Sequence, residues 1–424
     1  MKTNLADFIK DTPEGREADT ILRNCVHCGF CTATCPTYQL LGDELDGPRG
    51  RIYLIKQALE GAPVTRTTQR HLDRCLTCRA CETTCPSGVH YSRLLDIGRN
   101  VVQNRVGRSA LQALARKALR AVITRPALFR PLLKAGQLVR PLLPRMLQRK
   151  VPRAAQPAQP RPVTTHARRM LVLEGCVQPI LSPATNAAAA RVLDRLGITL
   201  LAAPQAGCCG AVSLHLDARE EALDFMRRNI DAWWPYIEQG VEALVITASG
   251  CGVTVKDYSY HLAHDPAYAE KARRVSELTR DVGAVVLAEA PRLQSLIAHE
   301  APPAPVRRIA FHCPCTLTHG LKIRGELEAL LVTLGFEVAP VRDAHLCCGS
   351  AGTYSILQPT LSQQLLENKI AALTASDPQE IVTANIGCQT HLQGATQTTV
   401  RHWVELVDEL LPHADVPGDA APAR

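Results

Sequence analysis

Two short stretches of the chain place four cysteines ahead of a proline in the same spacing. The first, CVHCGFCTATCP, begins at Cys25, and the second, CLTCRACETTCP, begins at Cys75. Both follow the pattern C-x2-C-x2-C-x3-C-P, which is typical of bacterial ferredoxins with [4Fe–4S] clusters. Three thiolates two residues apart can wrap one face of a cubane, whereas the fourth reaches the other cluster. We therefore expect two [4Fe–4S] clusters that carry electrons.

Each cluster should take three ligands from one stretch and one from the other. The predicted ligand sets are Cys25, Cys28, Cys31 and Cys85 for cluster A, and Cys75, Cys78, Cys81 and Cys35 for cluster B. A zinc site is the alternative, because CxxC pairs also bind zinc. Zinc needs neither a third evenly spaced cysteine nor the proline that follows, so the clusters are favoured.

Eight further cysteines belong to a segment that the chain contains twice. They are Cys176, Cys208, Cys209 and Cys251 in the first copy, and Cys315, Cys347, Cys348 and Cys388 in the second. Each copy holds an adjacent pair followed by glycine, and the two pairs lie 139 positions apart. A buried cysteine can be a small hydrophobe, but adjacent pairs repeated in register favour a third redox site, either an iron–sulfur centre or another thiolate site.

Four more residues near the second copy's cysteines have less specific patterns. Cys313 has no cysteine counterpart in the first copy, where Glu174 stands, and we expect an incidental thiol at the end of a strand. A histidine can be an axial ligand or a proton donor beside a redox site, but more often it is a hydrogen-bonded structural residue. The candidates are His312, His345 and His391. No residue is assigned a catalytic role.

The order of elements in each copy predicts an α/β domain. Each copy is expected to run strand, helix, strand, Cys-Cys-Gly, helices, strand and cysteine, and such alternation indicates a mostly parallel sheet. The cysteines then follow the strands at their carboxyl ends, where open α/β sheets gather ligands. Two such lobes facing each other would share one site.

The whole chain is predicted to be an α+β multidomain protein. It has 424 residues, so two or three domains are expected. The expected ranges are 1–99 for a helical, bacterial-type two-cluster ferredoxin domain, 100–167 for a basic amphipathic helical segment and Pro-rich linker, 168–305 and 306–412 for the two repeats, and 413–424 for a disordered tail.

Composition indicates a cytoplasmic protein. The polar start lacks the apolar core of a signal peptide, and no run approaches the length of a membrane span. The chain has 17 cysteines, an odd number, and cytosolic thiols are kept reduced, so metal or redox chemistry is favoured over disulfides.

One segment is strongly basic. Residues 97–173 contain seventeen Lys and Arg and no Asp or Glu. Its first expected helix has an apolar stripe, formed by Leu111, Leu114, Ala115, Ala118, Leu119 and Val122. This pattern favours a membrane-surface or partner-docking helix, with a solvated basic face as the alternative. Phe129 is the only aromatic residue in the segment, which argues against nucleic-acid binding by base stacking.

A two-cluster ferredoxin domain followed by two Cys-Cys-Gly repeats resembles a family of electron-transfer subunits. The family includes the iron–sulfur subunits of glycolate oxidase, anaerobic glycerol-3-phosphate dehydrogenase and heterodisulfide reductase. The stretches LRNCVHCGFCTATCPTYQLLGDELDGPRGRIYLIKQ and FHCPCTLTHGLKIRG look most like the glycolate oxidase subunit. The resemblance covers the whole chain except the basic segment.

The resemblance implies an oxidoreductase complex in which this chain alone is not catalytic. A flavoprotein partner carrying FAD would oxidise a 2-hydroxy acid, glycolate, and this chain would pass electrons towards a quinone of the respiratory chain. It would lie on the cytoplasmic face of the inner membrane, against anionic lipid. The alternatives are the corresponding subunit of a glycerol-3-phosphate or lactate dehydrogenase complex.

The repeats depart from the heterodisulfide reductase pattern, which closes with C-x-x-C. Ala248 and Asn385 stand where the first of those two cysteines would be. Each quartet therefore lacks one ligand of a five-cysteine cluster, which argues against a thiol–disulfide reductase. A four-cysteine centre, or none, remains open. No G-x-G-x-x-G fingerprint follows a strand, so flavin belongs on another chain.

Overall fold

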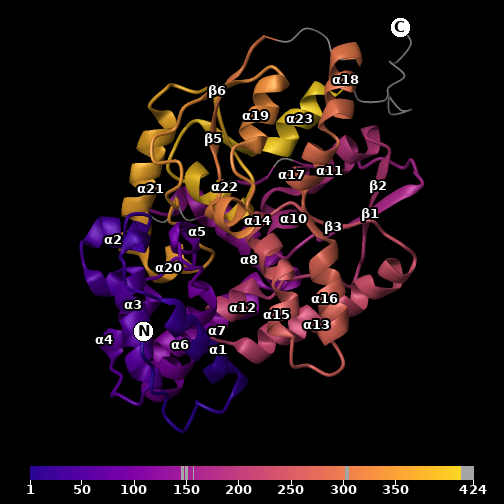
Figure 1. Cartoon of the computed structure of the whole chain (residues 1–424). Helices are drawn as coiled ribbons and strands as arrows, with labels where there is room; N and C mark the ends of the chain where they lie inside the picture. Colours follow the sequence, from indigo (N-terminus) through magenta and orange to yellow (C-terminus); the bar gives the residue numbers. More distant parts are fainter. Residues whose placement is uncertain (145–147, 149–150, 156, 301–304, 412–424) are drawn as a thin grey trace, which may run out of the picture.

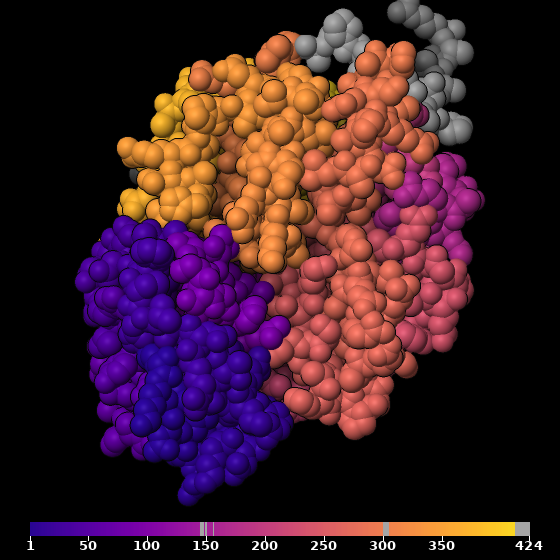
Figure 2. Space-filling view, viewed as in Figure 1, coloured from indigo at the N-terminus to yellow at the C-terminus, as the bar shows by residue number. Residues whose placement is uncertain are grey.

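The computed structural model describes residues 1–424 except 145–147, 149–150, 156, 301–304 and 412–424. A helical N-terminal region lies against two α/β units, and it contacts both of them (Figure 1). Figure 2 shows the same three masses in contact on one face of the molecule. The tail expected to be disordered, 413–424, lies outside the described residues.

The N-terminal region is a bundle of helices around the two cysteine stretches. Its elements are α1 (Pro13–Asn24), η1 (Phe30–Thr32), α2 (Pro36–Leu41), η2 (Glu44–Asp46), α3 (Pro48–Leu59), α4 (Arg66–Asp73), α5 (Ala80–Thr84) and α6 (Tyr91–Val106). The core packs α1, α3 and α6 together, with Leu22, Ile55 and Leu94 fully buried. Gly98 permits the close approach, because a Cβ there would lie 2.5 Å from Ile55 Cγ1. Helix α6 continues past residue 99, the expected domain boundary.

Each repeat contains a four-stranded parallel sheet, so the predicted fold class is confirmed. The sheets run β2-β1-β3-β4 and β6-β5-β7-β8. Their strands are β1 (Arg168–Val172), β2 (Ile198–Ala202), β3 (Leu244–Ile246) and β4 (Thr279–Asp281), then β5 (Arg308–His312), β6 (Glu337–Ala339), β7 (Glu380–Thr383) and β8 (Thr399–His402). The fourth strand of each sheet is additional to the three that the sequence predicts.

Helices cover both sheets. In the first copy they are α10 (Gln178–Leu181), α11 (Pro183–Arg195), α12 (Ala211–His215), α13 (Arg219–Glu238), α14 (Ser249–Lys256), α15 (Tyr258–His261), α16 (Ala269–Leu278), α17 (Val282–Ala288) and α18 (Ala290–Glu300). In the second they are η4 (Thr316–Gly320), α19 (Glu326–Thr333), α20 (Tyr354–Leu357), α21 (Pro359–Thr374), α22 (Ile386–Gln393) and α23 (Trp403–Leu410).

The two repeats share one hydrophobic core. It combines side chains from both sheets, including Met170 and Ile309, and is closed by α11 against α23. Polar contacts fix this packing, because Arg191 Nε lies 3.0 Å from Asp408 Oδ1 and Thr185 donates to Glu405 over 2.6 Å. The repeats are therefore held as one body, with the carboxyl ends of their strands close to each other.

The basic segment forms a helical hairpin of α7 (Ala110–Ile123) and α8 (Pro126–Val139), followed by the turn η3 (Arg140–Leu142). Neither helix buries a side chain. The expected stripe is divided, since Leu119 and Val122 are half-buried whereas Leu111 and Leu114 are exposed.

Some basic residues at the start of the hairpin form ion pairs within the molecule. Arg108 and Arg116 both reach Asp217 of the first repeat, at 3.1 and 3.2 Å, and both also contact Asp73 of α4. These arginines fix the start of α7 between the N-terminal region and the first repeat. Among the described residues, no helix combines the length and hydrophobicity that crossing a bilayer requires.

Candidate iron–sulfur and thiol sites

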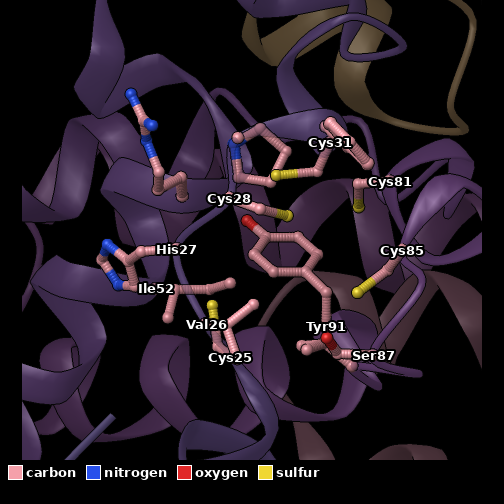
Figure 3. Close-up of a pocket in the computed structure, with 15 residues that line it drawn as sticks. Cys25, Val26, His27, Cys28, Cys31, Ile52, Cys81, Cys85, Ser87 and Tyr91 are labelled. Carbon is pink, nitrogen blue, oxygen red and sulfur yellow. The ribbon is translucent and has the colours of Figure 1, made fainter.

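The first cysteine pocket lies in the N-terminal region. Its lining includes Cys25, Cys28, Cys31 and Cys85, the four residues predicted for cluster A, together with Cys81 (Figure 3). Their sulfur atoms surround a hollow, and the ring of Tyr91 lies among them. Cys28 is exposed, so this pocket opens to the surface.

The second pocket adjoins the first. Its lining includes Cys35, Cys75, Cys78 and Cys81, which are the residues predicted for cluster B. Cys81 and Tyr91 line both pockets. The structure therefore brings the two predicted ligand sets into neighbouring hollows, and the division of ligands between clusters A and B stays a prediction.

The two cysteine loops adopt the same backbone. His27 and Gly29 in the first loop have positive φ, and so do Thr77 and Arg79, fifty positions later. These left-handed residues, which are uncommon outside glycine, give both loops turns at the same positions between their cysteines. In the second loop the Thr77 N–H lies 3.4 Å from Cys75 Sγ, in position to donate to a thiolate.

Three of the thiols in these pockets, Cys31, Cys78 and Cys81, favour the protonated form unless a metal binds them. Burial raises the pKa of Cys31 to about 11, and it also raises the pKa of Cys78 and Cys81. Thiolates, not thiols, bind metals, so binding must displace these protons. The cysteine-only lining suits iron–sulfur clusters, which thiolates hold.

Arg51 is a pocket residue that the sequence reasoning missed. It lines the second pocket, is 1% exposed, and donates to His71 O at 2.8 Å and Thr37 Oγ1 at 3.1 Å. A buried cation beside the cysteines would stabilise the negative charge of thiolate ligands. It follows Cys35 by sixteen residues, and no sequence motif identifies it.

The Cys-Cys-Gly turns require their glycines. Gly210 and Gly349 have φ of +94° and +86°. A Cβ on Gly349 would lie 2.6 Å from Ser362 O, and one on Gly210 would lie 2.9 Å from Ala222 O. The turn therefore packs directly on a helix, α13 in the first copy and α21 in the second, and holds its two thiols beneath the carboxyl ends of the strands.

Contacts between thiols run within each copy. In the first copy Cys208 interacts with Cys176 and Cys209, and Cys209 with Cys251. Hydrogen bonding to Cys208 and Cys251, with burial, raises the pKa of Cys209.

The second copy repeats this chain of four thiols. Cys315 Sγ lies 4.0 Å from Cys347 Sγ, Cys347 interacts with Cys348, and Cys348 interacts with Cys388. Each predicted quartet is thus brought together as a group of its own.

Between the two quartets the repeats meet through polar side chains. Ser249 and Thr316 hydroxyls lie 2.7 Å apart, and Asn385 Oδ1 accepts from Gly250 N at 3.3 Å. These contacts place the two groups of thiols side by side among the described residues, and a single site shared by both lobes stays a prediction.

The histidine candidates differ in environment. A ring nitrogen of His312 lies within 4.8 Å of both Cys348 Sγ and Cys388 Sγ. His391 Nε2 instead lies 3.2 Å from Ser362 Oγ, and His345 is exposed. Cys313 Sγ lies 3.0 Å from Thr318 Oγ1 and packs on the shared core of the repeats.

Family comparisons agree with this arrangement. Residues 21–89 match the model described as a 4Fe-4S dicluster domain, and residues 170–256 and 309–393 match the model described as a cysteine-rich domain. The glycolate oxidase iron-sulfur subunit of Escherichia coli K12 is 57% identical over 97% of this chain and 99% of its own length. A probable glycolate oxidase iron-sulfur subunit of Bacillus subtilis 168 is 31% identical over 92% and 91%.

The chain belongs to the family of glycolate oxidase iron–sulfur subunits. The resemblance predicted from the two cysteine stretches and the doubled Cys-Cys-Gly signal is thereby confirmed. Lactate utilization protein A of Geobacillus thermodenitrificans NG80-2 is similar over a smaller share, 27% identical over 52% of this chain and 87% of its own length.

Two cations beside the repeat thiols, an exposed arginine and a buried lysine, were also not predicted from the sequence. Hydrogen bonding to Cys176 and Cys209 lowers the pKa of Cys208, and the positive charge of Arg228 lowers it further. The Arg228 guanidinium lies over the ring of Phe225, 4.9 Å from its centroid. Lys369 is 3% exposed, lies near Cys347 and Cys348, and donates to Asp343 O at 2.8 Å. Burial in the first place lowers the pKa of Lys369. One positive charge beside each quartet favours thiolates in both copies.

Proposed function

We propose that this chain is the electron-transfer subunit of a flavin-dependent 2-hydroxy-acid dehydrogenase complex acting on glycolate, and that it passes electrons from a flavoprotein partner to a membrane quinone. The observation that carries the proposal is the pair of adjoining cysteine pockets that share Cys81 and Tyr91. Bound [4Fe–4S] clusters would supply one-electron transfer there. The 57% identical relative is named as the iron-sulfur subunit of glycolate oxidase, which supports this substrate.

The residues of this chain then hold and tune the clusters, while substrate oxidation belongs to the partner. Cluster A would be bound by Cys25, Cys28, Cys31 and Cys85, and cluster B by Cys75, Cys78, Cys81 and Cys35. Arg51 offsets negative charge at the second pocket. FAD would be bound by the flavoprotein, since the chain carries no nucleotide fingerprint.

A lactate or glycerol-3-phosphate complex is the alternative role. The lactate utilization relatives cover about half of this chain, for example 52% for that of Geobacillus thermodenitrificans. The glycolate oxidase relative covers 97%, including the basic hairpin. The wider match favours glycolate as the donor.

The hairpin α7–α8 is the part of the molecule proposed to meet the membrane. It exposes leucines along both helices and η3, namely Leu111, Leu114, Leu128, Leu132, Leu138 and Leu142. Exposed basic residues, among them Lys117, Arg130 and Lys134, lie on the same two helices. Exposed apolar side chains with cations around them suit an anionic bilayer surface, where quinone is dissolved.

The complex itself provides the test. The chain is produced anaerobically, either alone or together with the flavoprotein subunit of its complex. Glycolate-dependent reduction of a quinone analogue is then measured for both preparations. We expect turnover with the flavoprotein and none by this chain alone. Turnover by this chain alone would refute the subunit role. If the complex oxidised lactate or glycerol 3-phosphate but not glycolate, glycolate would be wrong as the electron donor.

A further inference from the structure

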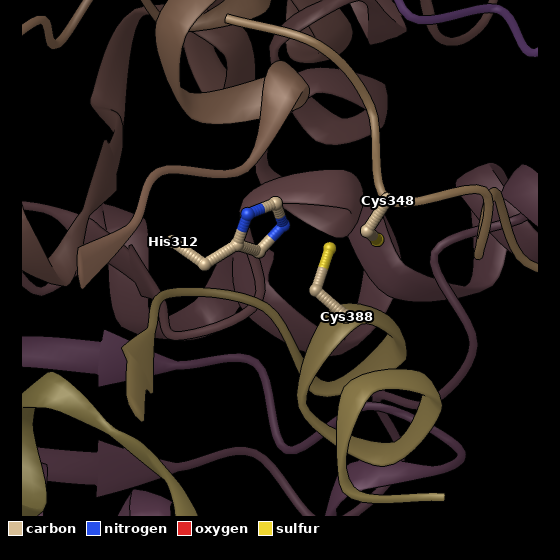
Figure 4. Close-up of side chains that lie close together, drawn as sticks. All are labelled: His312, Cys348 and Cys388. Carbon is tan, nitrogen blue, oxygen red and sulfur yellow. The ribbon is translucent and has the colours of Figure 1, made fainter. Parts of the chain in front are cut away.

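His312 stands at the end of β5, directed at two thiols of the second repeat. Figure 4 shows its ring beside Cys388, with Cys348 on the neighbouring loop. One ring nitrogen and the two sulfur atoms all lie within 4.8 Å of one another. The three residues are 2%, 1% and 6% exposed. They come from three separate elements: β5, the Cys-Cys-Gly turn and α22.

Both nitrogens of this ring are buried without a hydrogen-bond partner among the described residues. Leaving a buried polar group unsatisfied costs about 1–3 kcal/mol, and a structural histidine normally avoids that cost with a backbone or side-chain partner. His391 and His402 do so, through Ser362 and Thr247 O. A ligand that is not part of the chain, bound at the lone pair, would satisfy one of the two ring nitrogens of His312.

The types of these three donor atoms indicate which ligand would bind between them. An imidazole and two thiolates suit a borderline divalent metal ion, above all Zn²⁺. Three protein ligands leave a fourth position open, as in zinc sites that accept water or another small ligand. Lys369 near Cys348 adds positive charge that favours the thiolate there.

A hydrogen bond orients the second thiol. Asn385 Nδ2 donates to Cys388 Sγ at 3.5 Å, while Asn385 Oδ1 accepts from Gly250 N. This asparagine occupies the place of the first cysteine of the C-x-x-C pattern. It therefore supports a ligand where that pattern would supply one, as partners outside the metal shell commonly do.

The first repeat lacks these features. Leu173 is the register equivalent of His312 and is 4% exposed in the core, and Ala248 is the equivalent of Asn385. Its cysteines form no group of three within 4.8 Å among the described residues. The duplication has therefore diverged, with an imidazole in one copy only.

We propose that the second repeat binds one mononuclear zinc-type metal ion through His312, Cys348 and Cys388, and that the first repeat does not. This site is separate from the two ferredoxin pockets and goes beyond the electron-transfer role. The Cys315–Cys347 pair stays outside it, between the metal and the second pocket.

The full chain, with its iron–sulfur clusters assembled anaerobically, is supplied with Zn²⁺ and desalted. Metal content is measured by mass spectrometry, and X-ray absorption at the zinc edge identifies the ligands. We expect about one zinc per chain with two sulfur ligands and one imidazole. A zinc ion with four sulfur ligands, or no zinc, would overturn the proposal, and this measurement needs no variant.

Substitutions in each repeat test whether only the second repeat binds the metal ion. His312→Ala and Cys388→Ser should weaken zinc binding by more than about 100-fold in a chelator competition, because loss of an outer-shell partner alone costs about 10–100-fold. Cys251→Ser, the matched change in the first repeat, should leave zinc unchanged. Circular dichroism reports that each variant has folded, and iron is measured separately. Full zinc retention by His312→Ala, or loss of iron as well as zinc in Cys388→Ser with the fold intact, would show a different centre.

Discussion

Cys78, a predicted ligand of cluster B, packs beside Cys315 of the second repeat. The two side chains contact a hydrophobic cluster that contains Leu76, Cys347 and Tyr354. Burial, and after it negative charge on Cys315, raises the pKa of the Cys78 thiol. Tyr354 also donates to Arg74 O at 3.1 Å, which ties α20 to the end of α4. The second pocket therefore borders the second repeat's thiols, whereas the first pocket opens to the surface at Cys28.

Serine substitutions test the cluster assignment of each pocket separately. Cys28→Ser should remove cluster A and Cys78→Ser cluster B, each lowering iron from about eight to about four per chain. Both variants should block electron flow from the flavoprotein to a quinone analogue. Iron analysis, electron paramagnetic resonance and turnover measure these effects.

The matched control is Cys313→Ser, whose thiol lies on the shared core beside Thr318. It should keep full iron and turnover. Stoichiometric zinc with little iron in the wild-type N-terminal region would contradict the cluster assignment for both pockets.

The contact between Cys78 and Cys315 could not be predicted from the sequence, unlike the cysteine groups themselves. The cysteine spacings predicted both quartets and the parallel sheets, because spacing is local and the duplication compares the chain with itself. Packing between domains has no such local signal, so Arg51, Lys369 and the approach of Cys78 to the second repeat were not predicted. The polar strand β4, Thr279–Asp281, was missed because three residues show no alternation.

The glycine of the second Cys-Cys-Gly turn should be intolerant of a side chain. Gly349→Ala places a Cβ 2.6 Å from Ser362 O at a φ of +86°. Gly352→Ala is the control, because its φ is +61° but nothing lies within 4 Å. The positive φ alone costs about 1–2 kcal/mol, and overpacking adds about 1–3 kcal/mol at Gly349 only.

Chemical denaturation of both variants measures the difference. We expect Gly349→Ala to unfold at lower denaturant than Gly352→Ala and to lose metal from the second repeat, because Gly349 directly follows Cys348, a proposed metal ligand. Equal midpoints for the two variants would mean that the turn is not packed on α21 as described.

The exposed leucines of α7 should matter for membrane contact and not for folding. Leu111 and Leu114 are 78% and 63% exposed, so changing both to Glu removes little packing. Each buried leucine contributes about 1.5–3 kcal/mol when it leaves water, and the added charge opposes anionic lipid. Flotation with vesicles of anionic lipid at low salt should show strong binding by the wild type and weak binding by the variant.

The control is Val306→Glu with Val332→Glu, which adds the same charge at exposed positions of the second repeat. This control should still float, and binding by the wild type should weaken as salt screens the charges. If the wild type ignores these vesicles while Leu111→Glu with Leu114→Glu loses the flavoprotein, the hairpin is a partner-docking surface instead.

Asp281 should make the fold less stable as the pH rises. It ends β4, is 3% exposed, and accepts from Gly283 N at 2.8 Å through Oδ1, while Oδ2 is buried without a hydrogen-bond partner among the described residues. Burial raises the pKa of this carboxyl to about 7, from an unfolded value of about 4. Its protonated form is therefore favoured by folding.

The sign of the effect follows from proton binding. Between about pH 4 and pH 7 the unfolded chain has released this proton while the folded chain retains it, so stability falls as pH rises and levels off above pH 7. Asp281→Asn keeps the Oδ1 acceptor and cannot ionise. Relative to wild type, its melting temperature should therefore rise between pH 5 and pH 8, by the equivalent of about 1–3 kcal/mol. Asp7→Asn, at a carboxylate that is 93% exposed, is the control and should show no such trend. A constant difference between Asp281→Asn and wild type across this range would show that Asp281 is ionised in the fold and has a partner for its charge.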